Sequence, residues 1–214
     1  MRIPLLYPIL DADSLTASCG GGSLLQAVCS HALALAEAGC ILMQFRAKRL
    51  NAREALAQAR ELRRLLPGIT LIMNDRADLC LAAAFDGVHL GQEDLSPEGA
   101  RSVVGMESIV GLSTHNSAQM TEALVKPVDY LAIGPVFATG SKANADPAVG
   151  LPGVSEARRL RDESGRALPL VAIGGITRNN AEAVLKAGAD SVAVIGGLSG
   201  SPRESAREFF RLMM

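Results

Sequence analysis

The sequence contains no tryptophan, and aromatic residues make up only 3% of its 214 positions. Proteins that bind single-stranded nucleic acid stack its bases on aromatic side chains. A sequence with so few aromatic residues is therefore not expected to bind nucleic acid in this way. Neither sign of charge is in excess, because 21 Lys and Arg are balanced by 22 Asp and Glu. We therefore expect neither nucleic acid nor an anionic membrane as a partner.

Metal-binding and secretory patterns are equally scarce. The four cysteines, Cys19, Cys29, Cys40 and Cys80, form no Cys-x-x-Cys pair, and no histidine lies beside them at zinc-ligand spacing. We expect these cysteines to remain reduced and to pack as small apolar residues, as in a protein of a reducing compartment. No run approaches the ~18 apolar residues of a membrane span, and the apolar run in residues 1–8 is too short for a signal peptide. These features indicate a cytoplasmic protein.

Hydrophobic residues, in contrast, make up 49% of the chain and fall into a repeating pattern. Short continuous apolar runs, typical of strands buried on both faces, alternate with longer amphipathic segments. The predicted strands are residues 5–10, 40–45, 70–73, 87–90, 109–112, 130–133, 170–173 and 191–195. The predicted helices are residues 23–38, 52–66, 77–84, 97–104, 118–125, 154–164, 181–187 and 202–214.

Alternating strands and helices indicate an α/β protein with a parallel sheet. Eight such units favour closure into a single (β/α)8 barrel, or TIM barrel, because closure leaves no edge strand. We expect one domain over residues 1–214. Two stretches, residues 15–22 and 140–152, show neither helix nor strand pattern and are predicted to be irregular.

In such a barrel the functional site lies at the carboxyl ends of the strands. Polar, charged or glycine residues follow almost every predicted strand. In chain order they are Gln44, Arg46, Lys48, Asn74, Asp75, Gln92, Glu93, Asp94, Ser113, Thr114, His115, Thr139, Ser141, Lys142, Gly174, Gly175, Gly196 and Gly197.

Two features of this set suggest phosphate chemistry. Glycine pairs follow the seventh and eighth strands, where bare backbone N–H groups commonly hold a phosphate in this fold, and basic residues add charge. Asp75 and Asp94 follow neighbouring strands and either hold Mg²⁺ together or cap the helices that follow. The residues leave both alternatives open, and they do not identify the reaction.

At these same positions the sequence resembles the thiamine-phosphate synthase family, which includes TenI-like relatives. The resemblance spans almost the whole chain, and its most specific block is residues 86–94, Asp-Gly-Val-His-Leu-Gly-Gln-Glu-Asp. The other matching motifs are Gln-Phe-Arg-Ala-Lys at 44–48, Asn-Asp-Arg at 74–76, Gly-Leu-Ser-Thr-His at 111–115, Gly-Pro-Val-Phe-Ala-Thr at 134–139, Lys142, and Ala-Ile-Gly-Gly-Ile at 172–176.

The resemblance implies a transferase that couples a pyrimidine diphosphate to a thiazole phosphate, giving thiamine phosphate and pyrophosphate. It assigns pyrimidine-diphosphate binding to Gln44, Arg46, Lys48, Asn74, Ser113 and Lys142. It assigns Mg²⁺ binding to Asp75 and Asp94, and thiazole-phosphate binding to Thr139, Gly140, Ser141, Gly175, Ile195 and Gly196. The two substrates are the expected partners, and a homo-oligomer is left open.

Three positions depart from the family pattern. Ala47 stands where an acidic residue is usual, Ser141 replaces a threonine, and Gly196 stands where a serine often donates to the thiazole phosphate. The alternatives are a TenI-like thiazole tautomerase and a phosphate-binding barrel without catalysis. Neither needs the complete set of Arg46, Lys48, Asp75, Asp94 and Lys142, so the set favours the synthase.

Overall fold

A computed structural model describes residues 3–18, 23–140 and 146–213. Eight parallel strands pair in sequence order, and β1 closes the barrel against β8. The strands are β1 (Leu6–Asp11), β2 (Leu42–Arg46), β3 (Thr70–Asn74), β4 (Gly87–Leu90), β5 (Ile109–Thr114), β6 (Tyr130–Ile133), β7 (Leu170–Ile173) and β8 (Ser191–Val194). The predicted single barrel is confirmed, and strands lie at each of the eight expected places.

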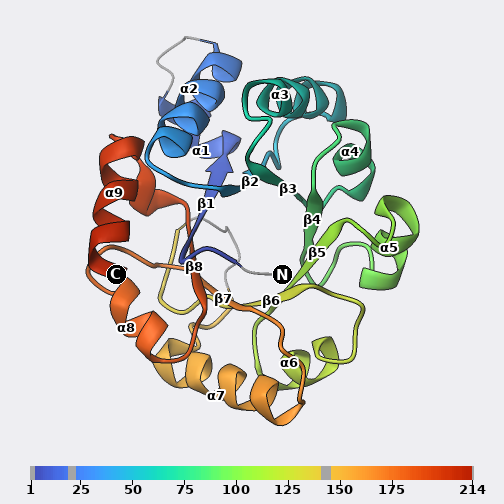
Figure 1. Cartoon of the computed structure of the whole chain (residues 1–214), viewed down its shortest axis with the longest axis vertical. Coiled ribbons are helices and arrows are strands. Elements are labelled where there is room, and N and C mark those ends of the chain that lie inside the picture. The colour runs from blue at the N-terminus through green and yellow to red at the C-terminus, as the bar shows by residue number, and fades with distance from the viewer. Residues whose placement is uncertain (1–2, 19–22, 141–145, 214) are drawn as a thin grey trace.

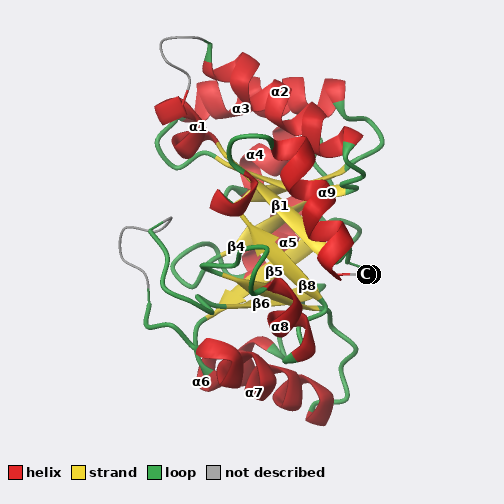
Figure 2. Ribbon diagram, turned by 90° about the vertical axis from the view of Figure 1, so that its left-hand side faces the viewer, coloured by secondary structure: helices red, strands yellow, loops and turns green. Residues whose placement is uncertain are grey.

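Helices surround the barrel (Figure 1). In side view, α2 and α3 lie on one side of the tilted strands, and α6 and α7 lie on the opposite side (Figure 2). The helices are α1 (Ala12–Ser18), α2 (Leu24–Glu37), α3 (Ala52–Leu65), α4 (Ala77–Ala82), α5 (Pro97–Val104), α6 (Ser117–Ala123), α7 (Gly150–Glu163), α8 (Ala181–Lys186) and α9 (Pro202–Met213), with a short 3-10 helix, η1 (Gly196–Leu198).

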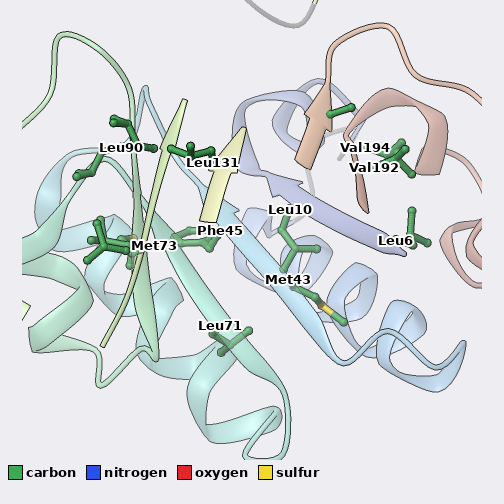
Figure 3. Packing of buried hydrophobic residues seen from close by; sticks show 14 of the residues in the cluster. Leu6, Leu10, Met43, Phe45, Leu71, Met73, Leu90, Leu131, Val192 and Val194 are labelled. Carbon is green, nitrogen blue, oxygen red and sulfur yellow. The ribbon is translucent and has the colours of Figure 1, made fainter. Parts of the chain in front are cut away.

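Alternating strand residues build two separate cores. Those that point outward pack beneath the helices, and Leu10, Met43, Leu71 and Val192 are among them (Figure 3). A smaller cluster fills the barrel interior and is made of Tyr7, Ile9, Leu42, Ile72, Tyr130, Ala132, Val171 and Ala193. The interior is therefore packed below the rim, and ligand chemistry belongs at the carboxyl ends of the strands.

Two predictions about irregular segments were wrong in part. Residues 15–18 of the first segment belong to α1, which follows β1 without a break. In the second, α7 begins at Gly150, four residues before the predicted start at Val154. The first four residues of α7, Gly-Leu-Pro-Gly, are typical of a loop, which is why the sequence predicted a later start. Proline is nevertheless tolerated in the first turn of a helix, because the backbone N–H groups there have no helical partner. Residues 19–22 and 141–145 lie outside the described residues.

None of the helices described is both long and apolar enough to cross a membrane. The described cysteines, Cys29, Cys40 and Cys80, are free and buried, as expected of apolar core residues. Burial raises the pKa of the Cys40 thiol to about 12, so this thiol stays protonated and unreactive at neutral pH.

Candidate active site

Polar side chains from the first five strands converge at one rim because all the strands run parallel. Strand register places Asp11 beside Arg46 and Asn74 beside His89. Gln44 and Arg46 follow Leu42 at two-residue steps, so they continue the inward-facing side of β2. This half of the rim brings together the described residues predicted to bind the pyrimidine diphosphate.

Arg46 is held in place by acidic residues that the sequence analysis did not single out. Its Nη1 lies 2.5 Å from Asp11 Oδ1 and 3.7 Å from Asp13 Oδ2. The Asp11 side chain is only 4% exposed and also accepts a hydrogen bond from Ser14 in α1. A buried carboxylate thus orients the guanidinium at the rim, which favours bidentate recognition of phosphate. The available signal was an acidic residue directly after the first apolar run.

Lys48, Asp75 and Asp94 form a second charged group. Lys48 Nζ lies 2.6 Å from Asp75 Oδ2, and Asp94 Oδ2 accepts a 2.7 Å hydrogen bond from the Gly91 backbone. Burial raises the pKa of Asp75, the Lys48 ammonium opposes that rise, and the Asp94 carboxyl beside it adds to it. Asp75 also adopts a left-handed conformation with φ of 62°, which is uncommon for a residue with a Cβ.

The helix-capping alternative for the two aspartates is excluded. The residue that precedes α4 is Arg76, which makes no side-chain cap, and α5 is capped by Ser96, which accepts from Gly99 N. Neither Asp75 nor Asp94 serves its helix in this way. Two adjacent carboxylates, one largely withdrawn from water, remain as a pair that favours a cation between them.

The donor set suits Mg²⁺ better than a softer metal. No cluster of three or more His, Cys, Asp or Glu side chains occurs within the described residues, so a cage made by the protein alone is absent there. Mg²⁺ usually takes one or two carboxylates and fills its remaining positions with water and substrate phosphate oxygens. Asp75 and Asp94 are the carboxylates that could hold it.

A chain of hydrogen bonds crosses the barrel below this rim. Gln44 Nε2 donates to Tyr7 Oη at 3.0 Å, and Tyr7 Oη lies 3.0 Å from Tyr130 Oη. His89 joins Tyr130 to Ser113, with Nδ1 2.8 Å from Tyr130 Oη and Nε2 2.8 Å from Ser113 Oγ. Burial lowers the pKa of His89 to about 4, so its ring is neutral at pH 7.

The other half of the rim consists of the loops after β6, β7 and β8. Gly174 and Gly175 have positive φ, and Phe137 N donates to Gly174 O at 3.0 Å, which ties two of the loops together. A Cβ on Gly175 would lie 2.7 Å from Ala138 O, whereas a Cβ on Gly196 would meet nothing within 4 Å. Glycine at 175 is therefore required by packing as well as by its backbone conformation.

The predicted thiazole-phosphate residues Thr139, Gly140, Gly175, Ile195 and Gly196 all follow strand ends in this half. They occupy the same rim as Asp94. The roles of Ser141 and Lys142 stay predictions, because both residues lie outside the described part of the chain. The described site residues thus divide into a charged half after β1–β5 and a glycine-rich half after β6–β8.

Charged groups and glycine-rich loops at the carboxyl ends of a closed parallel barrel place the candidate site where TIM-barrel enzymes have their active sites. Comparison with known proteins makes the assignment more specific. A family model described as thiamine monophosphate synthase matches residues 14–198. The chain belongs to this family.

Individual relatives agree with the family model. A thiamine-phosphate synthase of Koribacter versatilis is 53% identical over 100% of this chain and 97% of its own length. One from Moorella thermoacetica is 41% identical over 87% of this chain and 86% of its own. A solved thiamine phosphate pyrophosphorylase from Pyrococcus furiosus is 32% identical, with a TM-score of 0.79 over 97% of this chain and 94% of that one.

A phosphoribosyl anthranilate isomerase from Thermus thermophilus, 18% identical with a TM-score of 0.64, shares the fold alone. These relatives, which are named thiamine-phosphate synthases and match over most of their length, favour the synthase over the tautomerase and over a barrel without catalysis. The activity is synthesis of thiamine phosphate, and the enzyme is a transferase.

Proposed function

We propose that the enzyme couples 4-amino-5-hydroxymethyl-2-methylpyrimidine diphosphate with a thiazole phosphate by a Mg²⁺-assisted, dissociative displacement. The observation that carries the proposal is the division of the rim. Arg46, Lys48, Asp75 and Asp94 gather in one half, and the glycine loops form the other. A diphosphate needs concentrated positive charge, whereas a single phosphate can be held largely by backbone N–H groups.

The diphosphate half would work by charge placement. Asp11 orients Arg46, and Lys48 reaches the edge of the carboxylate pair. Asn74 and Gln44 lie on neighbouring strands within the same half, where they would hold the pyrimidine substrate. Lys142, predicted to approach from the loop after β6, would add a third cation.

Asp75 and Asp94 would hold Mg²⁺, which supplies positive charge to the diphosphate oxygens when bound. The aminopyrimidine ring stabilises positive charge on its exocyclic methylene carbon. The bond from that carbon to the diphosphate oxygen breaks, pyrophosphate departs, and the thiazole nitrogen donates its electron pair to form the new carbon–nitrogen bond. The protein's task is to orient both substrates and to stabilise negative charge on pyrophosphate.

The metal pair provides the test. We expect Asp94→Asn to lower kcat by at least about tenfold, or roughly 1.4 kcal/mol in the barrier, because charge on the leaving group grows in the transition state. Binding of the thiazole phosphate should change little. Steady-state formation of thiamine phosphate across a Mg²⁺ titration measures the first effect, and calorimetry measures the second.

Glu98→Gln is the matched control, since Glu98 forms an exposed ion pair with Lys126 on the outside of the barrel. It should retain wild-type rates. If the wild type turns over equally well with the metal chelated, the metal assignment is wrong. If the wild type makes no product at saturating Mg²⁺, the coupling reaction itself is wrong.

A further inference from the structure

Five polar side chains form one continuous hydrogen-bonded chain through the barrel interior. They come from five different strands and connect, in order, Gln44, Tyr7, Tyr130, His89 and Ser113. Tyr7, Gln44, Tyr130 and His89 are buried, with exposures of 1%, 3%, 0% and 7%. Only the two ends, Gln44 and Ser113, belong to residues predicted to bind substrate.

The chemistry of the links gives the chain a direction. An amide nitrogen can only donate, so Tyr7 Oη must accept from Gln44 Nε2. The hydroxyl proton of Tyr7 then has Tyr130 Oη as its partner within the described residues. Tyr130 must in turn donate its own proton to Nδ1 of His89. A neutral imidazole that accepts at Nδ1 carries its proton at Nε2, which therefore donates to Ser113 Oγ.

We propose that this interior chain fixes His89 as the Nε2–H tautomer and thereby commits the Ser113 hydroxyl to donate its proton to a ring nitrogen of the bound pyrimidine. The inference rests on the proposed function for the identity of the substrate. Ser113 already accepts from His89, so its own proton is directed toward a further acceptor. A pyrimidine ring nitrogen can accept the proton of the Ser113 hydroxyl. An amino group in the same place is itself a donor, so its N–H would face the O–H of Ser113 and no hydrogen bond would form in this direction.

Tyr7, Tyr130 and His89 are therefore positioning residues that act through Ser113. Their packing supports this role. The His89 and Tyr130 rings stack with centroids 5.4 Å apart, and Tyr7 meets Tyr130 edge to face at 6.0 Å. A Cβ on Gly111 would lie 2.1 Å from Tyr130 Cζ, so a glycine at this point of β5 makes room for the ring.

The tautomer can be read directly in the full-length protein labelled with ¹⁵N, by long-range ¹H–¹⁵N correlations of the imidazole rings. The His89 signals are identified by their loss in His89→Gln. We expect the wild type to carry the proton at Nε2, and Tyr130→Phe, which removes the donor to Nδ1, to shift the population toward Nδ1–H. A wild-type Nδ1–H tautomer would overturn the proposal, and so would a Tyr130→Phe variant with an unchanged tautomer.

Binding of substrate fragments tests whether the Ser113 hydroxyl donates its hydrogen bond to the pyrimidine ring. We expect Ser113→Ala to weaken binding of the pyrimidine alcohol, which lacks the diphosphate, by about tenfold, and to leave binding of inorganic pyrophosphate unchanged. Equal losses for the two fragments, or a loss confined to pyrophosphate, would overturn the assignment to a ring nitrogen.

Kinetics test the positioning role. Tyr130→Phe should raise KM for the pyrimidine diphosphate about fivefold, with a smaller change in kcat and none in KM for the thiazole phosphate. Tyr7→Phe leaves the Tyr130–His89 link in place and should give a smaller change in the same direction. Equal increases in both KM values would indicate a general structural defect and contradict the role. A wild type without turnover would count against the proposed function, while the tautomer measurement judges this inference independently.

Discussion

Gly175 and Gly196 lie in the same half of the rim, yet their surroundings differ. Gly175 has a φ of 63°, and a Cβ there would lie 2.7 Å from both Ala138 O and Phe137 Cβ. Any side chain at 175 would strain the backbone and push against the loop after β6. Gly196 has open space around it, so a side chain at this position tests ligand binding without disturbing the fold.

Gly196→Ser should tighten binding of the thiazole phosphate about three- to tenfold. The serine would restore the hydroxyl donor that the family often has here, and a hydrogen bond to a charged group contributes roughly 1.5 kcal/mol. KM for the pyrimidine diphosphate should not change. Calorimetry with the thiazole phosphate and steady-state kinetics with both substrates measure the effect.

Gly68→Ser is the control for this prediction. Gly68 also has open space around its would-be Cβ, but it precedes β3 and so lies at the opposite rim. It should leave both substrates unaffected. An unchanged affinity in Gly196→Ser would mean that the phosphate is not within reach of this residue.

At the scale of elements, one arrangement recurs three times at the amino-terminal rim. An aspartate directly before an even-numbered strand accepts a hydrogen bond from a backbone N–H of the preceding strand, and also pairs with an arginine from the helix that leads into that preceding strand. The three sets are Arg63–Asp86–Leu71, Arg101–Asp129–Val110 and Arg161–Asp190–Leu170. Each joins two neighbouring strands and the helix that precedes the first of them, at the rim opposite the site.

Asp190→Asn should therefore reduce stability and spare catalysis. Arg161 is 8% exposed and would lose Asp190, the less exposed of its two carboxylate partners, and keep only Asp162. Removing one member of a fully buried pair costs several kcal/mol, and because Asp190 is 35% exposed we expect about 1–3 kcal/mol. Urea denaturation measures the loss, while kcat and both KM values should stay near wild type.

Asp162→Asn serves as the control, because Asp162 pairs with Arg158 and also with Arg161, but its own side chain is 52% exposed. The free energy of unfolding of this variant should differ from that of the wild type by less than about 0.5 kcal/mol. Equal destabilisation by the two substitutions would show that the amino-terminal rim gains nothing particular from Asp190. A large fall in kcat for Asp190→Asn would contradict the prediction, because it would show that Asp190 also affects the active site at the opposite rim.

The elements themselves were largely predictable from the sequence. Strands buried on both faces appear as continuous apolar runs, and β4, β6 and β7 coincide with their predicted bounds. The helix α1 was missed because it is seven residues long and carries no helical apolar repeat. In such a short segment the contacts with neighbouring elements outweigh local propensity.

The candidate site was predictable in its residue types but not in its contacts. A rule about strand ends finds Arg46, Lys48, Asp75 and Asp94, because it depends only on where each strand stops. It cannot find that Asp11 orients Arg46, or that two tyrosines 123 positions apart share a hydrogen bond. Those contacts depend on which residues face one another across a closed barrel, and strand periodicity does not contain that information.

At the scale of the whole molecule, closure brings β1 against β8 and encloses a polar chain in an apolar interior. His89 is the titratable member of that chain within the range of mild acid. Its pKa falls from 6.5 in water to about 4 in the folded barrel, because burial penalises the charged imidazolium. The folded state therefore binds fewer protons than the unfolded chain between these two values.

This difference makes global stability depend on pH. Stability rises with pH wherever the unfolded state binds more protons, so the contribution of neutral His89 is complete above pH 6.5 and is lost as the pH falls toward 4. At about 1.4 kcal/mol for each pKa unit, the loss amounts to roughly 3 kcal/mol. The free energy of unfolding, measured in urea at a series of pH values, should reveal it.

His89→Gln isolates this contribution, since glutamine keeps a donor and an acceptor but does not titrate. The stability difference between wild type and His89→Gln should be largest at pH 7 and shrink by roughly 3 kcal/mol by pH 4. Lys186→Gln, on the exposed face of α8, should follow the wild-type profile instead. A difference that stays constant from pH 7 to 4 would show that His89 titrates equally in the folded and unfolded chains. That result would be incompatible with a neutral imidazole enclosed between Tyr130 and Ser113.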